Sequence, residues 1–200
     1  MRAVVARDLS FPSMNTHPTS LRKAHGFTLI ELLTFLAIVA VLAGIGAPAF
    51  TGLTRSAKLT SATNDLFASL LMARSEAAKR RSRVAVCKSS DGNACAASGG
   101  WEQGWIVFHD ANNSGTRDSG EEIVVKAQAL PRDLRLSGNL NVAKYVSYAP
   151  TGEAKLAGGG FQAGTITLCN QYSDREEARQ IVISSAGRPR VQRTQVADCV

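Results

Sequence analysis

Three arginines near the C-terminal end of the chain could bind phosphate groups. Arg188 and Arg190 belong to the sequence SAGRPR, and Arg193 follows three positions later. Gly187 can adopt the positive φ that a tight turn needs, and Pro189 stiffens the turn. Guanidinium groups bind phosphates through paired hydrogen bonds. Because strand-like runs flank the segment, the sequence predicts a rigid hairpin that projects these arginines; the alternative is a solvated turn without a ligand.

A second group of polar residues is spaced like a calcium-binding loop. Hard cations prefer six or more oxygen ligands, and a glycine in the middle of such a loop allows the sharp turn. Strands rather than helices are predicted on both sides, and Arg117 would oppose a cation, so a structural hairpin is the favoured interpretation. The oxygen-bearing residues and the glycine are Asp110, Asn112, Ser114, Gly115, Asp118 and Glu121.

One carboxylate lies at the front of a long apolar run. Residues 27–50 read FTLIELLTFLAIVAVLAGIGAPAF, and Glu31 is their only charged residue. As a helix this run would span about 36 Å, enough to cross the hydrocarbon core of a membrane. A carboxylate there is costly unless a cation pairs with it. A secretory signal peptide fits poorly, because the apolar run is longer than a typical signal core and small-residue cleavage sites occur only near AGIGAPA. A plain membrane anchor leaves Glu31 unexplained.

The cysteines and the lack of catalytic motifs limit the function classes. Four cysteines behind an export-type segment predict two disulfides, and of the three possible connectivities we favour Cys87–Cys95 with Cys169–Cys199. The sequence contains no nucleophile elbow, HExxH motif or phosphate loop, so we expect neither an enzyme nor a metal or cofactor site. The formal net charge of +7 permits an anionic partner but does not require one.

The elements that would position these residues form an α+β arrangement. An apolar stripe at helical spacing predicts an amphipathic helix over residues 51–82, and its basic end, KRRSR, suits the C-terminal end of a helix dipole. Gly44, Gly46 and Pro48 would break a soluble helix but are tolerated in a membrane helix. Residues 83–200 then carry short β-rich segments separated by turn residues. We expect strands at 84–88, 104–109, 122–127, 144–149, 165–170, 179–184 and 191–196.

The sequence GFTLIELL, with Glu31 inside it, resembles the processing site of type IV prepilins and type II secretion pseudopilins. The resemblance implies a leader of residues 1–26, cleavage by a prepilin peptidase after Gly26, and methylation of Phe27 as the new first residue. Glu31 would then pair with the Phe27 amine of an adjacent subunit during assembly. The leader is long for this family, and Met14 could be the true start. The resemblance also implies the type IV pilin fold, a long helix packed on an antiparallel sheet.

The segment GWIVFHDANNSGTRDSGEEIV, residues 104–124, resembles the GspH/FimT branch of the family. In FimT-type minor pilins a C-terminal Gly-Arg-x-Arg motif is associated with DNA binding in natural transformation. Gly187, Arg188 and Arg190 match that motif, and Arg193 is added from its position alone. The resemblance therefore implies a minor pilin that binds double-stranded DNA non-specifically. The alternative is a structural tip or initiation subunit of the FimU or GspH kind, without DNA binding.

The same resemblance implies where the protein acts. Lys and Arg before the apolar segment place the N-terminus in the cytoplasm. The precursor would span the inner membrane once, with its head in the periplasm, and would join other pilins in a surface filament after processing. The sequence does not distinguish a pilus from a type II secretion system.

Overall fold

The computed structural model describes residues 26–172 and 177–199, apart from the side chains of residues 47–49. Except for Gly26, the predicted leader and the alternative start at Met14 lie outside the described residues. The chain divides into two compact units, Met1–Gly46 and Ala47–Val200, and each is described by itself.

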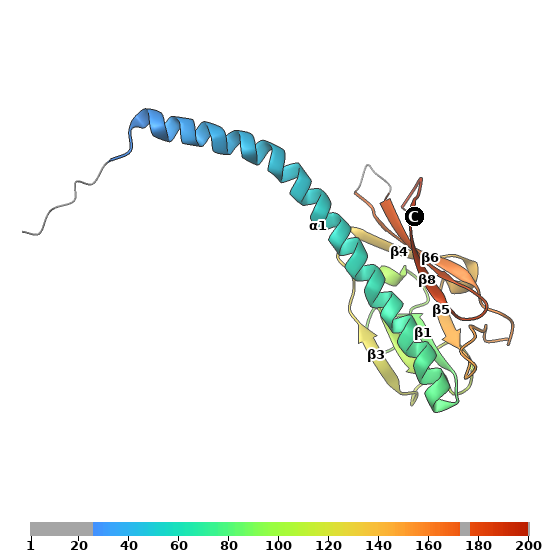
Figure 1. Ribbon diagram of the computed structural model, residues 1–200. Helices are drawn as coiled ribbons and strands as arrows, with labels where there is room; N and C mark the ends of the chain where they lie inside the picture. The colour runs from blue at the N-terminus through green and yellow to red at the C-terminus, as the bar shows by residue number, and fades with distance from the viewer. Residues whose placement is uncertain (1–25, 173–176, 200) are drawn as a thin grey trace, which may run out of the picture. The chain divides into compact units, whose positions relative to one another are not determined.

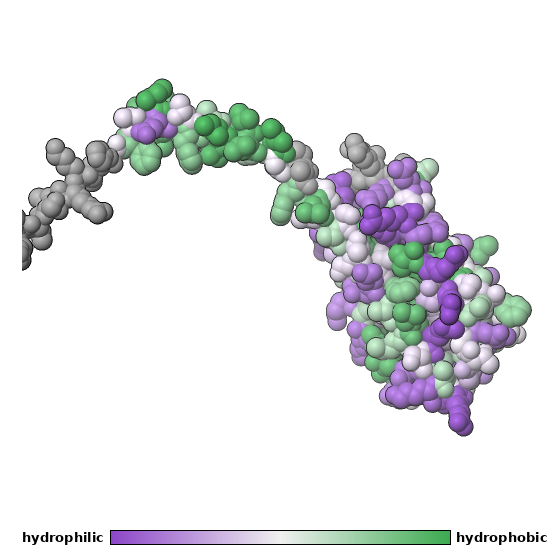
Figure 2. All heavy atoms as spheres, in the orientation of Figure 1, coloured by the Kyte–Doolittle hydropathy of each residue, from purple (hydrophilic) through white to green (hydrophobic). Residues whose placement is uncertain are grey.

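One helix, α1 (Leu29–Arg80), runs from the first unit into the second. It continues through the segment of Gly44, Gly46 and Pro48, so these residues do not end it. In the first unit its large apolar side chains are exposed, as Figure 2 shows. Among the described residues, α1 has an apolar stretch long enough to cross a membrane, and none of that stretch is buried in the protein. The membrane segment predicted for residues 27–50 includes this exposed apolar part of α1.

In the second unit, α1 buries the stripe that its sequence predicts. Leu66, Leu70, Ala73 and Ala77 are fully buried in the hydrophobic core. The helix ends where Arg81 adopts a left-handed conformation with φ 53°, while the N–H of Ser82 donates to the carbonyl of Ala77. The amphipathic helix predicted over residues 51–82 is therefore the head portion of α1.

Two antiparallel four-stranded sheets complete the head (Figure 1). The first has the order β3-β2-β1-β5 and the second the order β4-β6-β7-β8. Side chains from α1 and from both sheets meet in one core that includes Val86, Val107, Leu168 and Ile181. The strands are β1 (Val84–Lys88), β2 (Trp105–His109), β3 (Ile123–Ala127), β4 (Leu134–Gly138), β5 (Tyr145–Tyr148), β6 (Gly164–Asn170), β7 (Glu177–Ile183) and β8 (Pro189–Gln195).

The predicted strands all correspond to observed ones, but β4 was not predicted. Its sequence, LRLSG, contains no β-branched or aromatic residue. Leu134 and Leu136 are nevertheless buried, because β4 pairs with β6 along its whole length. Tertiary pairing therefore determines this strand more than the intrinsic preference of its residues.

Two disulfides fix loops in the head. Cys87 is joined to Cys95, and Cys169 to Cys199, which is the connectivity expected from the sequence. The second disulfide attaches the C-terminal end of the chain to β6. It therefore holds the segment after β8 against the same sheet that carries the predicted arginine hairpin.

Candidate functional site

The N-terminal motif forms a capping box at the start of α1. The N–H of Glu31 donates to Thr28 Oγ1 over 3.3 Å, and the N–H of Thr28 donates to Glu31 Oε2 over 3.2 Å. Such a reciprocal pair satisfies two N–H groups that a helix start leaves without partners. The sequence TLIE contains this signal, Thr followed three positions later by Glu, and sequence reasoning missed it. Pairing of Glu31 with the Phe27 amine of another subunit stays a prediction.

The predicted arginine hairpin is the turn between β7 and β8. The N–H of Gly187 donates to the carbonyl of Ser184 over 2.8 Å, and the strands pair directly afterwards, with Ile183 opposite Pro189. Gly187 has φ +74° and is buried. A β-carbon at this position would overlap the carbonyl oxygen of Gly152. Glycine is therefore required here both by the backbone conformation and by close packing.

The structure brings Arg188 and Arg190 together but separates Arg193 from them. Side chains alternate between the faces of a strand. Arg190 lies opposite Val182 on the outer face of the sheet, whereas Arg193 lies opposite Arg179 on the face toward α1. Arg193 lines a groove there together with Thr60 and other residues of α1. The prediction that Arg193 extends the same arginine cluster is therefore wrong, because three residues along a strand reverse the direction of the side chain.

The arginines of the hairpin differ from most cations of the head. Many others are engaged: Arg80, for example, pairs with Glu76 and Glu122, and Arg83 donates to the carbonyls of Lys155 and Leu156. Arg188 and Arg190 are exposed, and within residues 26–172 and 177–199 their side chains have no ion pair or hydrogen bond. Their guanidinium groups are free to bind an external anion.

A polar surface continues from Arg190 across the sheet. The side-chain amide of Gln192 donates to Gln180 Oε1 over 2.9 Å, and that of Gln180 donates to Thr167 Oγ1 over 3.3 Å. These three residues lie on the outer face of β8, β7 and β6. In these strands that face contains no carboxylate, so nothing on it repels an anion that Arg190 binds. Sequence reasoning missed this row of side chains, which becomes visible only when the strand register is known.

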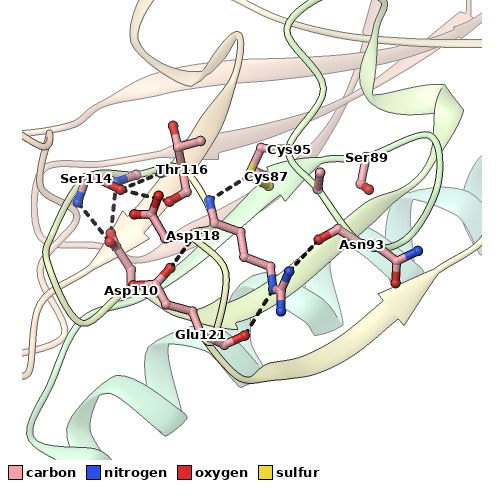
Figure 3. The surroundings of a disulfide bond; sticks show 12 residues. Cys87, Ser89, Asn93, Cys95, Asp110, Ser114, Thr116, Asp118 and Glu121 are labelled. Atoms are coloured by element: carbon pink, nitrogen blue, oxygen red, sulfur yellow. Dashed lines mark hydrogen bonds between the residues drawn. A yellow bond between two sulfur atoms is a disulfide. The ribbon is translucent and has the colours of Figure 1, made fainter.

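The calcium-like loop is a structural hairpin between β2 and β3 (Figure 3). Asp110 is fully buried and accepts hydrogen bonds from the N–H groups of Ser114 and Gly115. Burial raises the pKa of Asp110, and these two hydrogen bonds oppose that rise. The carboxylate of Glu121 accepts from the N–H groups of Ala111 and Asp118. Within the described residues, the carboxylates of Asp110 and Glu121 thus hold the loop itself.

Arg117 reinforces the same loop. It donates from Nε to the carbonyl of Glu121 and from Nη1 to the carbonyl of Asn93, and its backbone N–H donates to Sγ of the disulfide-bonded Cys95 over 3.3 Å. Among the described residues, no cluster of three or more His, Cys, Asp or Glu side chains is arranged to hold a metal ion. The antiparallel pairing of β2 with β3 on either side of the loop confirms the predicted hairpin.

Comparison with known proteins agrees with these features. The family model described as type II transport protein GspH matches residues 62–187, and that of the prokaryotic N-terminal methylation motif matches residues 21–47. A search of curated protein sequences gives no significant match.

Solved structures with a similar fold include minor pilins. The type IV minor pilin FimU of Pseudomonas aeruginosa, in space group P65, is 20% identical; the alignment covers 71% of this chain and 100% of that one, with a TM-score of 0.53. In space group P21 the identity is 20%, the coverages are 74% and 99%, and the TM-score is 0.55. The minor pseudopilin EpsH of Vibrio cholerae is 13% identical, with coverages of 68% and 96% and a TM-score of 0.47.

The methylation motif indicates how the chain is processed. Its match implies processing by a prepilin peptidase, and the apolar part of α1 anchors the protein in the inner membrane before it joins other pilins. The GspH model covers more than half of the chain and includes most of the head. This chain therefore belongs to the GspH family of type IV minor pilins and pseudopilins.

Proposed function

We propose that this minor pilin binds extracellular DNA through Arg188 and Arg190 and so contributes to DNA uptake in natural transformation. The observation that carries the proposal is a pair of exposed arginines, without an ion pair among the described residues, on a turn that Gly187 fixes against Gly152. Because the turn is already held in place, little conformational freedom of the loop has to be lost when a phosphate binds. In this proposal the subunit is not an enzyme.

The contact would be weak for each subunit and independent of base sequence. Two guanidinium groups neutralise few phosphates, and phosphate contacts alone carry no sequence information. The neighbouring Gln192 and Gln180 offer amide groups that can also bond phosphate oxygens. Several copies in one filament would raise the overall affinity through multivalency.

The test compares the purified head, residues 55–200, with an Arg188→Ala/Arg190→Ala double variant. This segment keeps the whole core, since its first core residue is Leu59, and it keeps the contacts of Ser56 and Lys58 with the sheet. Binding to a labelled blunt duplex is measured by fluorescence anisotropy over a range of salt concentrations. We expect the double variant to lose most of its affinity and the salt slope to fall by about 2.

A matched control removes the same charge elsewhere. Arg132 and Lys144 are also exposed, and within the described segments their side chains have no ion pair. Arg132 precedes β4, at the end of its sheet away from the β7–β8 turn, and Lys144 precedes β5, away from Gly152. Arg132→Ala/Lys144→Ala should bind duplex nearly as well as the parent. Equal affinities of the two double variants at unchanged melting temperature would refute the proposal.

A structural tip or initiation subunit is the second candidate, and one observation favours it. The solvent side of α1 in the head carries Leu71 at 42% and Met72 at 46% exposure, with Ala68 and Ser75 beside them. An uncharged stripe of this kind is suited to contact with other pilins. On this reading Leu71→Asp would reduce filament assembly, whereas the parent head would show no salt-dependent affinity for DNA.

A further inference from the structure

A second loop with an exposed aromatic ring lies beside the arginine turn. After β5 the chain forms a small hairpin in which Lys155 pairs with Phe161. The ring of Phe161 is part of a side chain that is 63% exposed, and Lys155 Nζ lies 4.7 Å from the ring centroid. The loop between them, LAGGG, contains little side-chain bulk. The Phe161 ring is therefore exposed to solvent with a cation beside it.

This hairpin and the arginine turn are joined through Ala154. A β-carbon on Gly187 would come within 3.0 Å of the Ala154 N atom, and the N–H of Gln162 donates to the Ala154 carbonyl over 2.9 Å. Phe161 directly precedes Gln162, which is hydrogen-bonded to Ala154. Arg188 directly follows Gly187, which is packed on Ala154. Figure 1 agrees, since the segment after β5 and the turn between β7 and β8 lie side by side.

The side chains of both loops point away from the core. Ala154 is fully buried opposite Tyr148, so its neighbour Lys155 and the paired Phe161 face outward. Pro189 is buried opposite Ile183, so its neighbours Arg188 and Arg190 face outward as well. The ring and the two guanidinium groups are thus exposed to solvent, on two loops that meet at Ala154.

We propose that Phe161 is a stacking platform for an unpaired DNA base whose neighbouring phosphates Arg188 and Arg190 hold, an inference that rests on the proposed function. Aromatic rings beside cationic residues bind single-stranded nucleic acid in this way, and stacking accepts any base. Lys155 holds one side of the ring, which leaves the other side for a base. Phe161 is exposed, and β-carbons at Gly158 and Gly159 in the adjoining loop would contact nothing within 4 Å.

Stacking on Phe161 would make this surface selective for unpaired bases. In a duplex the faces of the bases are covered by their neighbours, so Phe161 could reach a base only at an end. In a single strand each base can turn onto the ring while the phosphates follow the arginines. Single-stranded DNA should therefore bind more tightly than blunt duplex of the same length.

The test uses the head, residues 55–200, and measures anisotropy with three labelled probes of equal length: a dT20 strand, a blunt 20-bp duplex and a fully abasic strand. Phe161→Ala should weaken binding to dT20 about tenfold, to the level at which the parent binds the abasic strand. Its affinity for duplex should stay within about twofold. Phe161→Trp should keep dT20 binding, because a larger ring still stacks.

The control for lost apolar surface is Leu140→Ala. Leu140 is 93% exposed and precedes Asn141, whose carbonyl accepts a hydrogen bond from Gln162. This variant should bind all three probes like the parent. A Phe161→Ala head that binds dT20 as tightly as the parent overturns the stacking role.

The Arg188→Ala/Arg190→Ala variant distinguishes refutation of the stacking role of Phe161 from refutation of the proposed DNA binding. If Arg188→Ala/Arg190→Ala weakens binding to duplex while Phe161→Ala changes nothing, the stacking platform is refuted and the phosphate contact stands. If the arginine variant binds all probes like the parent, both proposals are refuted. Melting temperatures of all variants should match that of the parent, because each side chain removed is exposed.

Discussion

Gly187 lies against the carbonyl oxygen of Gly152 so closely that no side chain fits between them. The same carbonyl accepts a hydrogen bond from Arg74 Nε over 2.9 Å. The turn that carries Arg188 and Arg190 is therefore connected to α1 through a single peptide group. This arrangement explains how two arginines at the end of a hairpin keep a defined position on the head.

Gly187→Ala should disturb both the turn and its support. A non-glycine residue with positive φ costs about 1–2 kcal/mol, and the new methyl group must also displace Gly152. We expect the free energy of unfolding to fall by at least this amount and the affinity for DNA to fall with it. Urea unfolding and anisotropy measure the two effects.

Gly158→Ala is the matched control for Gly187→Ala. Gly158 has no positive φ, and a β-carbon there would meet nothing within 4 Å. This change should leave stability unchanged or raise it slightly, since alanine restricts the unfolded chain more than glycine does. Equal effects of the two substitutions would show that the Gly187–Gly152 contact does not support the turn.

Much of the architecture was predictable because local patterns and tertiary packing agree. The stripe from Leu59 to Ala77 and the β-branched strands follow the periodicities of helix and strand. β4 was missed because its residues have little strand preference, and its pairing partner, β6, lies about 30 residues away in sequence.

The site was only partly predictable. Gly187, Arg188 and Arg190 form the turn that their sequence indicates. Arg193 lies on the other face from Arg190 because β8 already begins at Pro189, whereas the sequence predicted a strand only from residue 191. The contact of Gly187 with Gly152 depends on how two distant loops pack, so it required the folded structure.

Tyr148→Phe should not destabilise the head, although Tyr148 is fully buried. Its hydroxyl has no hydrogen-bond partner among the described residues, and burial raises the pKa of Tyr148. A buried polar group without a partner costs about 1–3 kcal/mol, so removing it should be neutral or stabilising. The midpoint of urea unfolding should stay or rise.

Tyr145→Phe removes a tyrosine hydroxyl that does have a hydrogen-bond partner, three residues before Tyr148. The hydroxyl of Tyr145 accepts a hydrogen bond from the N–H of Ala157 over 2.9 Å. Removing it should destabilise the head by about 1 kcal/mol. If Tyr148→Phe proves as costly as Tyr145→Phe, the Tyr148 hydroxyl must form a bond that the structure does not show.

The ion pairs of Arg80 should make stability depend on pH in the acid range. Arg80 Nε lies 2.8 Å from Glu76 Oε2, and its Nη1 lies 2.7 Å from Glu122 Oε2. These contacts hold the pKa of each carboxyl below its usual 4.5. Groups with a lowered folded-state pKa stabilise the protein above the unfolded value, and this contribution is lost as pH falls through the folded value.

Arg80→Gln should therefore lower the melting temperature most at neutral pH. The difference from the parent should shrink as pH falls below 4.5, where the carboxyls of Glu76 and Glu122 become protonated. Arg132→Gln removes the same charge from an exposed residue and should give a difference that stays nearly constant with pH. A constant difference for Arg80→Gln would mean that its ion pairs do not contribute to stability.

Glu153→Gln should strengthen DNA binding, because Glu153 is a carboxylate of the hairpin after β5, directly before Ala154 and two residues before Lys155. Its side chain is 42% exposed and pairs with Lys155 over 3.3 Å. Removing it relieves repulsion of phosphates and releases the Lys155 ammonium. Exposed charge interactions are worth up to about 1 kcal/mol, so affinity should rise by about two- to fivefold at low salt and less at high salt.

Asp65→Asn is the control, since Asp65 is exposed on α1 and this substitution changes the net charge equally. If both variants gain the same affinity, the gain reflects net charge alone, and DNA does not approach the corner formed by Lys155, Phe161 and the arginine turn.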